Sequence, residues 1–232
     1  RVWVWGVAAA LIWLVGTWKY YPFAMGLMLI PVLRLRRGWT VLVGFAAATL
    51  VFMVLTWDNF RFSSQSNTNM IDYGDFVVLG RVPVVARMLG TVVGADGLQA
   101  GDLLFYLLAA LAMVWGAAVA LSTRRSLVHP AMLAVAGSAL FLSSVLVAGF
   151  GWGYKAAFLL VCVPLVAALT AAGKWILVSS SVAVLALIAL QSVVVWNTVL
   201  ATFSGVIAAG FAFGMAAALI ARSVRRPRQH AH

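Results

Sequence analysis

The sequence predicts an all-α integral membrane protein, a polytopic helical bundle of about eight membrane segments that forms a single domain over residues 1–232. Hydrophobic residues make up 65% of the chain and charged residues only 9%, whereas soluble domains carry about a quarter charged residues. Seven of the apolar runs have about 17 to 24 residues, the length that an α-helix needs to cross a bilayer. Lysine and arginine cluster between these runs, as expected for membrane topology.

Eight apolar segments can be placed along the chain. Their bounds are 2–18, 22–33, 39–57, 103–121, 130–150, 156–172, 175–196 and 198–221. The second has only 12 residues, about 18 Å as an α-helix, so it must recruit flanking residues or stay partly re-entrant. Because Arg1 directly precedes the first run, we expect the chain to be the C-terminal part of a longer protein.

The basic residues predict the orientation of the segments. If the arginine-rich C-terminal tail is cytoplasmic, alternation of the segments places eleven basic residues on that side and five on the other. The five outer residues are Lys19, Arg61, Arg81, Arg87 and Lys155. The positive-inside rule therefore predicts a cytoplasmic C-terminus.

Composition also excludes two kinds of site. The net charge of +11 would suit a nucleic-acid-binding protein, but the basic residues lie between apolar runs rather than along one polar face, so no nucleic-acid partner is expected. The single cysteine, Cys162, lies within an apolar run, which predicts neither a disulfide nor a cysteine metal site. Gly210 and Gly214 form a GxxxG pattern, which we expect to pack helices within the chain.

The extracytoplasmic loop is predicted over residues 58–102. It contains all five carboxylates of the protein, namely Asp58, Asp72, Asp75, Asp96 and Asp102. Residues 61–69 are rich in serine and asparagine, so we expect irregular structure there. Residues 76–90 are apolar but carry Arg81 and Arg87, a pattern that favours a short interfacial helix whose arginines reach toward lipid phosphates.

The first candidate binding motif is the run 18–22, WKYYP, at the outer end of the first segment. The ammonium of Lys19 would lie at the depth of the lipid phosphates, where the hydroxyls of Tyr20 and Tyr21 could donate hydrogen bonds to a phosphate oxygen. Pro22 then begins the next helix at a position that needs no amide donor. The motif suits phosphate binding, and equally an ordinary interfacial anchor of lysine and aromatic residues.

The second candidate motif is the run 149–155, GFGWGYK, at another outer turn. Its three alternating glycines would let the backbone approach a ligand closely, and Tyr154 supplies a hydroxyl donor. Lys155 opens the sixth segment, where a cation opposes the helix dipole and so calls for an anion nearby. We interpret the motif as a second phosphate-binding element, with an interfacial loop as the alternative.

Three carboxylates are candidates for a general base. Asp72 and Asp75 are three residues apart, which on a helical turn places both on one side. There they could share a divalent cation, or divide into a base and a hydroxyl binder. Asp58, beside Trp57 at the expected membrane surface, is the third candidate. The plainer interpretation is that all three are solvated loop carboxylates, and the sequence predicts no set of metal ligands and no firm cofactor.

Two stretches carry a family resemblance. In the first, a helix ends in KYYP at 19–22 and is followed by a short apolar segment and by RLRRGW at 34–39. In the second, YK at 154–155 leads into an apolar helix with FLL at 158–160 and with Pro164. With these features the chain resembles the C-terminal half of a GT-C superfamily glycosyltransferase, of the bacterial family 87 type.

The resemblance implies a hexosyltransferase of the bacterial inner (plasma) membrane that serves the cell envelope. Such an enzyme would move a sugar from a polyprenyl-phosphate donor to a glycan or lipid acceptor on the extracytoplasmic side, within membrane lipid. The donor phosphate would be bound by Lys19 and Lys155 with help from Tyr20, Tyr21 and Tyr154, and Arg61, Arg81 and Arg87 would contact lipid or sugar. The superfamily's catalytic carboxylate typically belongs to the first outer loop, which we expect to precede this chain.

Two other functions remain open. A polytopic transporter or lipid flippase is one, although ion-coupled transporters usually place ionisable groups near the membrane midplane, where the eight segments carry none. A non-catalytic membrane assembly protein, whose outer loop binds a partner, is the other. It would predict that Lys19 and Lys155 can be replaced without loss of activity.

Overall fold

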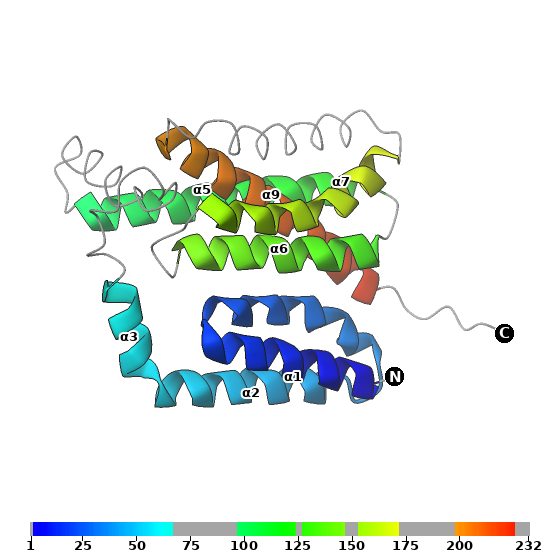
Figure 1. The fold of residues 1–232 in the computed structure, drawn as a ribbon. Coiled ribbons are helices and arrows are strands. Elements are labelled where there is room, and N and C mark those ends of the chain that lie inside the picture. Colours follow the sequence, from blue (N-terminus) through cyan, green and yellow to red (C-terminus); the bar gives the residue numbers. More distant parts are fainter. Residues whose placement is uncertain (1, 67–96, 124–126, 147–152, 172–197, 226–232) are drawn as a thin grey trace.

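The fold is known from a computed structural model that describes residues 2–66, 97–123, 127–146, 153–171 and 198–225. Every regular element in these residues is a helix (Figure 1), so the predicted all-α bundle is confirmed for this part of the chain. The helices are α1 (Val2–Trp18), η1 (Tyr21–Arg34), α2 (Trp39–Leu55), α3 (Trp57–Ser66), α5 (Gly97–Ser122), α6 (Val128–Leu146), η3 (Gly153–Cys162), α7 (Val163–Thr170) and α9 (Thr198–Arg225). The expected segment 175–196 and interfacial helix 76–90 lie outside the described residues.

The first three helices form one group. α1, η1 and α2 lie side by side, with η1 running back along α1 (Figure 1). Their shared core is small, and its buried members are Ala9, Ile12 and Leu29. η1 also packs against α6, so it joins this group to the rest of the bundle.

The short second segment is a 3-10 helix. η1 has 14 residues, with Pro22 in its first turn and Pro31 inside. A 3-10 helix rises about 2.0 Å per residue, so η1 extends about 28 Å, whereas an α-helix of the same length would extend about 21 Å. Because of this winding, η1 is about as long as α1 and α2, whose 17 residues each extend about 26 Å as α-helices.

The main core surrounds α9, which packs against α5 and α6. Phe211, Met215 and Leu219 on α9 are fully buried there. A β-carbon at Gly214 would overlap the backbone of Met113 on α5, so the glycine is what allows the two helices to approach. Gly210 likewise faces α5, which confirms that the GxxxG pattern packs helices within the chain.

The C-terminal ends of α5 and α9 are joined by a hydrogen bond. Nη1 of Arg222 donates to the carbonyl oxygen of Ala120 at 3.3 Å. The last carbonyls of a helix have no partner within it, and an arginine both satisfies one of them and suits the negative end of the helix dipole. The bond therefore supports the close crossing of the two helices at this end.

The expectation of irregular structure over 61–69 is wrong as far as Ser66, because α3 continues to that residue. Asp58 lies in the first turn of α3, where a carboxylate stabilises the positive end of the helix dipole. Phe60 packs its ring edge-on against Tyr20, with centroids 5.0 Å apart. Tertiary packing and end charge thus outweigh the weak helix propensity of serine and asparagine.

Two other predicted segments are divided. Segment 39–57 ends as a helix at Leu55, and α3 starts after Thr56 in a new direction (Figure 1). Segment 156–172 begins as the 3-10 helix η3 and continues as the α-helix α7. Pro164 lies in the first turn of α7, a position where proline is common.

One described stretch, Gly205–Arg225, is long and apolar enough to cross a membrane by length and composition. Six further apolar stretches of 10–17 residues occur in the described helices. The coarse prediction of apolar helices is therefore confirmed, and the number of membrane crossings stays a prediction.

Cys162 provides a test of the packing around α6. Its side chain is fully buried, and its sulfur lies 3.3 Å from the Ser138 hydroxyl on α6. We expect a maleimide to modify Cys162 only after the protein is unfolded in detergent, whereas a cysteine at the exposed Asn59 on α3 should react in the folded state. Fast labelling of Cys162 in the folded protein, followed by mass spectrometry, would contradict this packing.

Candidate functional site

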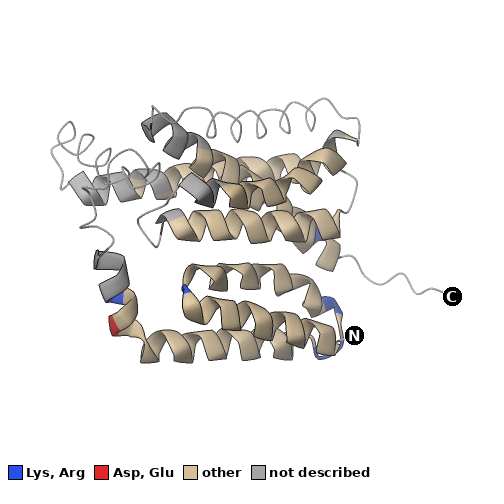
Figure 2. Ribbon diagram, in the orientation of Figure 1, with Lys and Arg blue, Asp and Glu red and all other residues tan. Residues whose placement is uncertain are grey.

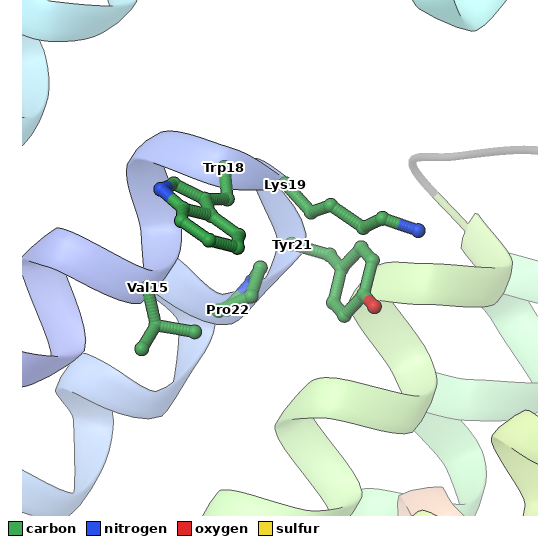
Figure 3. Close-up of a pocket in the computed structure, with 5 residues that line it drawn as sticks. All are labelled: Val15, Trp18, Lys19, Tyr21 and Pro22. Carbon is green, nitrogen blue, oxygen red and sulfur yellow. The ribbon is translucent and has the colours of Figure 1, made fainter.

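The candidate site is an open hollow where α1 turns into η1. It has a volume of about 470 Å³ and is lined by Val15, Trp18, Lys19, Tyr21 and Pro22. All five residues come from the end of α1, the start of η1 or the connection between them, so local chain geometry alone brings them together. Figure 3 shows them from close by.

Among the described residues that line this hollow, Lys19 is the one cation. Its side chain is exposed, and its ammonium forms no hydrogen bond or ion pair with the residues that the structure describes. The ammonium and the Tyr21 hydroxyl point to the same side, toward α6, while Trp18, Val15 and Pro22 form the apolar side (Figure 3). The hollow therefore combines a cation and a phenol with an apolar wall.

Tyr21 connects this hollow to α6 and η3. Its ring lies against that of Phe158 on η3, with centroids 6.2 Å apart. Its carbonyl oxygen lies 3.1 Å from the Ser143 hydroxyl. That hydroxyl carries one proton and lies closer to the Ala139 oxygen, at 2.6 Å, so the ring contact is the firmer link.

The contact with Phe158 places the backbone of Tyr154 and Lys155 at the same end of the bundle as Lys19. Tyr154 and Lys155 lie in the first turn of η3, one helical turn from Phe158. Their side chains lie outside the described part of the structure. The backbone arrangement is the one that a site shared by Lys19 and Lys155 would need.

Tyr20 faces the other way. Its hydroxyl donates to the Thr56 carbonyl oxygen at 3.4 Å, and its ring packs against Phe52 and Phe60, with centroids 5.9 and 5.0 Å away. It is not among the residues that line the hollow. The two tyrosines that the sequence places together therefore separate, with Tyr21 toward η3 and Tyr20 toward the junction of α2 and α3.

Asp58 and Arg61 lie on α3, and both are exposed. Phe60 is the residue of α3 that faces Tyr20. Asp58 precedes it by two residues, about 200° around an α-helix, so its carboxylate points away from the Tyr20 side. Neither Asp58 nor Arg61 lines the hollow.

The remaining predicted site residues, Asp72, Asp75, Arg81 and Arg87, lie outside the described residues. Within the part that is described, no group of three or more histidine, cysteine or acidic residues could hold a metal ion.

Basic residues of the described helices gather at the helix ends. Arg34, Arg36 and Arg37 lie at the end of η1 and in the turn after it, and the last turn of α9 is also basic. Lys19 lies in the connection at the opposite end of η1. Figure 2 shows both ends in blue, with uncharged helix between them.

Two contacts of the site are not predicted by the sequence. Trp18 belongs to the WKYYP motif and Phe158 to the FLL run, but neither the packing of Phe158 against Tyr21 nor the contact of Ser143 with the Tyr21 carbonyl is foreseen. Segment 130–150 carries three serines, Ser138, Ser143 and Ser144, and nothing in the sequence distinguishes Ser143 from the other two. Phe158 and Tyr21 are far apart in the chain, so no local sequence pattern predicts their contact.

This arrangement suits an amphiphile with an anionic head. A phosphate could accept hydrogen bonds from an ammonium and a phenol, while an attached apolar chain could lie against the apolar wall. No carboxylate lines the hollow, so the described residues offer binding there without a general base. Comparison with models of protein families, with characterised proteins and with solved structures gives no significant match, so the contacts within the chain itself carry the functional argument.

Proposed function

We propose that this chain is part of a membrane glycosyltransferase that takes a sugar from a polyprenyl-phosphate donor and passes it to an acceptor hydroxyl on the non-cytoplasmic side. In this proposal the hollow beside Lys19 receives the phosphate of the donor. The observation that carries the proposal is the exposed ammonium of Lys19 at the rim of an apolar-walled hollow, without a partner among the described residues.

The membrane location is supported by the surface of α2. None of its 17 residues is buried, although nearly all are apolar, and Leu50, Val54 and Leu55 are 66%, 68% and 78% exposed. Exposure of this apolar surface to water would be unfavourable, and large contiguous apolar patches are rare on soluble monomers. Lipid is the solvent that suits it, with the basic helix ends at the two interfaces.

The length of η1 agrees with this placement. A hydrocarbon core is about 30 Å thick, and η1 extends about 28 Å because of its 3-10 winding. It would therefore cross nearly the whole core, which keeps Lys19 and the arginine cluster after Arg34 at opposite interfaces. This separation supports a span rather than a re-entrant segment.

The chemistry needs a cation and a base. As the sugar leaves the donor, negative charge grows on the phosphate, and a cation held there lowers the barrier by stabilising that charge. A carboxylate must accept the proton of the acceptor hydroxyl. Because Asp58 does not line the hollow, we propose Asp72 or Asp75 for that role.

The described helices favour a transferase over an ion-coupled transporter. Their lysine, arginine and aspartate residues lie near helix ends, whereas coupled transport usually places such groups near the midplane. A flippase would also bind a lipid phosphate, but it would not form a glycosidic bond.

The proposal predicts that the protein binds a polyprenyl monophosphate much more tightly than the matching uncharged polyprenol. Binding can be measured in detergent by fluorescence competition, and sugar transfer from polyprenyl-phosphate sugars by product analysis. Equal affinity for the phosphate and the alcohol would contradict the role of Lys19. Phosphate-selective binding without transfer of any sugar would favour the flippase.

A further inference from the structure

We infer that α3 is a membrane-surface helix, with Trp57 and Arg61 against the lipid headgroups and with Asp58 and Asn59 facing water. The inference rests on the proposed membrane location and goes beyond it, because it assigns a lipid-binding surface outside the hollow of Lys19. It also differs from the sequence prediction, which placed an interfacial helix at 76–90.

The direction of α3 is the first support. α2 ends at Leu55, and the chain turns at Thr56, so that α3 crosses the end of the bundle instead of extending α2 (Figure 1). If α2 runs along the membrane normal, α3 runs roughly parallel to the surface. In this orientation α3 starts where α2 leaves the hydrocarbon core of the membrane.

The distribution of side chains around α3 is the second support. With about 100° between successive residues, Trp57 and Phe60 fall on one side of the helix and Arg61 beside Trp57. Asp58 and Asn59 fall on the opposite side, where Phe62 is the one apolar residue. An apolar face flanked by arginine is typical of helices that lie in the interface plane, where arginine reaches the phosphates along its apolar stem.

The contacts of α3 show which part of the apolar face remains for lipid. Phe60 is taken up by the protein, since its ring packs against Tyr20. Trp57 is 54% exposed, and it continues the exposed apolar surface of Val54 and Leu55 on α2. Lipid that covers α2 would therefore also reach Trp57, at the depth where tryptophan is enriched.

Tyr20 fixes the level of this helix. Its hydroxyl donates to the carbonyl oxygen of Thr56, the residue that follows the last turn of α2. Its ring packs against that of Phe60 on α3. Lys19 directly precedes Tyr20 in the chain, so α3 and the hollow lie at one membrane surface. A headgroup-level helix beside the hollow would help to keep its rim at phosphate depth.

The test uses an environment-sensitive fluorescent label on single cysteines in the full chain, in a Cys162→Ala background. Trp57→Cys and Arg61→Cys report the lipid-facing side, Asn59→Cys reports the water-facing side, and Ala47→Cys on α2 is the reference. The protein is placed in vesicles of phosphatidylcholine and phosphatidylglycerol. Quenching is measured with aqueous iodide and with nitroxide lipids labelled at the headgroup or deep in the chain.

We expect deep-chain quenching at position 47, headgroup-level quenching at 57 and 61, and iodide quenching at 59. Iodide quenching at all three α3 positions, with position 47 in lipid, would overturn this inference and leave the proposed membrane location intact. Shielding of 57 and 61 from both quenchers would also overturn it, since protein would then cover that face. Iodide quenching at position 47 as well would overturn the membrane location itself.

Discussion

Replacing Gly214 by leucine is expected to remove most of the folded protein. A β-carbon at this position would overlap the backbone of Met113 on α5. A helix backbone cannot shift locally to relieve such an overlap, whereas a flexible side chain can change its rotamer. Typical overpacking costs about 1–3 kcal/mol, and a clash with backbone should exceed that range. The free energy of unfolding of a whole domain is only about 5–15 kcal/mol. Separation of α5 from α9, which form much of the main core, would therefore remove a large part of that stability.

The matched control is Gly44→Leu on α2. A β-carbon at Gly44 meets nothing within 4 Å, so the same change of residue there should leave folding nearly unchanged. Both variants can be compared by size-exclusion chromatography in detergent and by thermal unfolding. Equal behaviour of the two variants would mean that α5 and α9 do not cross at Gly214.

Much of the helical organisation can be predicted from the sequence, because apolar runs bounded by polar or basic residues mark the helices directly. The predicted start of segment 39–57 and the predicted bounds of segment 2–18 match α2 and α1. The errors are of another kind. The sequence pattern does not reveal that η1 winds as a 3-10 helix or that residues 61–66 are helical. Both depend on packing against other parts of the chain, as between Phe60 and Tyr20.

The candidate site was predictable only in part for the same reason. Lys19 and Tyr21 stand in one local motif, and the structure keeps them together at the hollow. Tyr20 belongs to the same motif but turns toward Thr56 and Phe60. Which of two adjacent tyrosines faces the site depends on helices that follow later in the chain, and a single sequence does not reveal that choice.

Lys19→Ala is expected to weaken binding of a polyprenyl phosphate about tenfold. A charged hydrogen bond contributes about 1.5–3 kcal/mol, and the low end applies because the Lys19 side chain is exposed and screened by solvent. A tenfold change in affinity corresponds to about 1.4 kcal/mol. Lys19→Arg should retain much of the binding, because it keeps a cation with donors at the same rim.

Arg36→Ala is the matched control for loss of one positive charge. Arg36 is also exposed, and it lies in the turn after η1, at the end opposite Lys19. Its loss changes the net charge equally but should leave donor binding unchanged. Equal weakening in both variants would point to general electrostatic attraction to the whole protein, and unchanged binding in Lys19→Ala would end the assignment of the site.

A double-mutant cycle with Lys155→Ala decides whether the two motifs form one site. If both ammonium groups contact the same phosphate, each should partly compensate for the loss of the other, so the effects of the single variants should not add in the double variant. Independent sites would give additive effects instead. All variants should unfold at the same temperature, so that folding does not affect the comparison. Non-additivity of about tenfold would then show that Lys19 and Lys155 bind one anionic headgroup. The contact of Tyr21 with Phe158 would in that case hold the two parts of one site together.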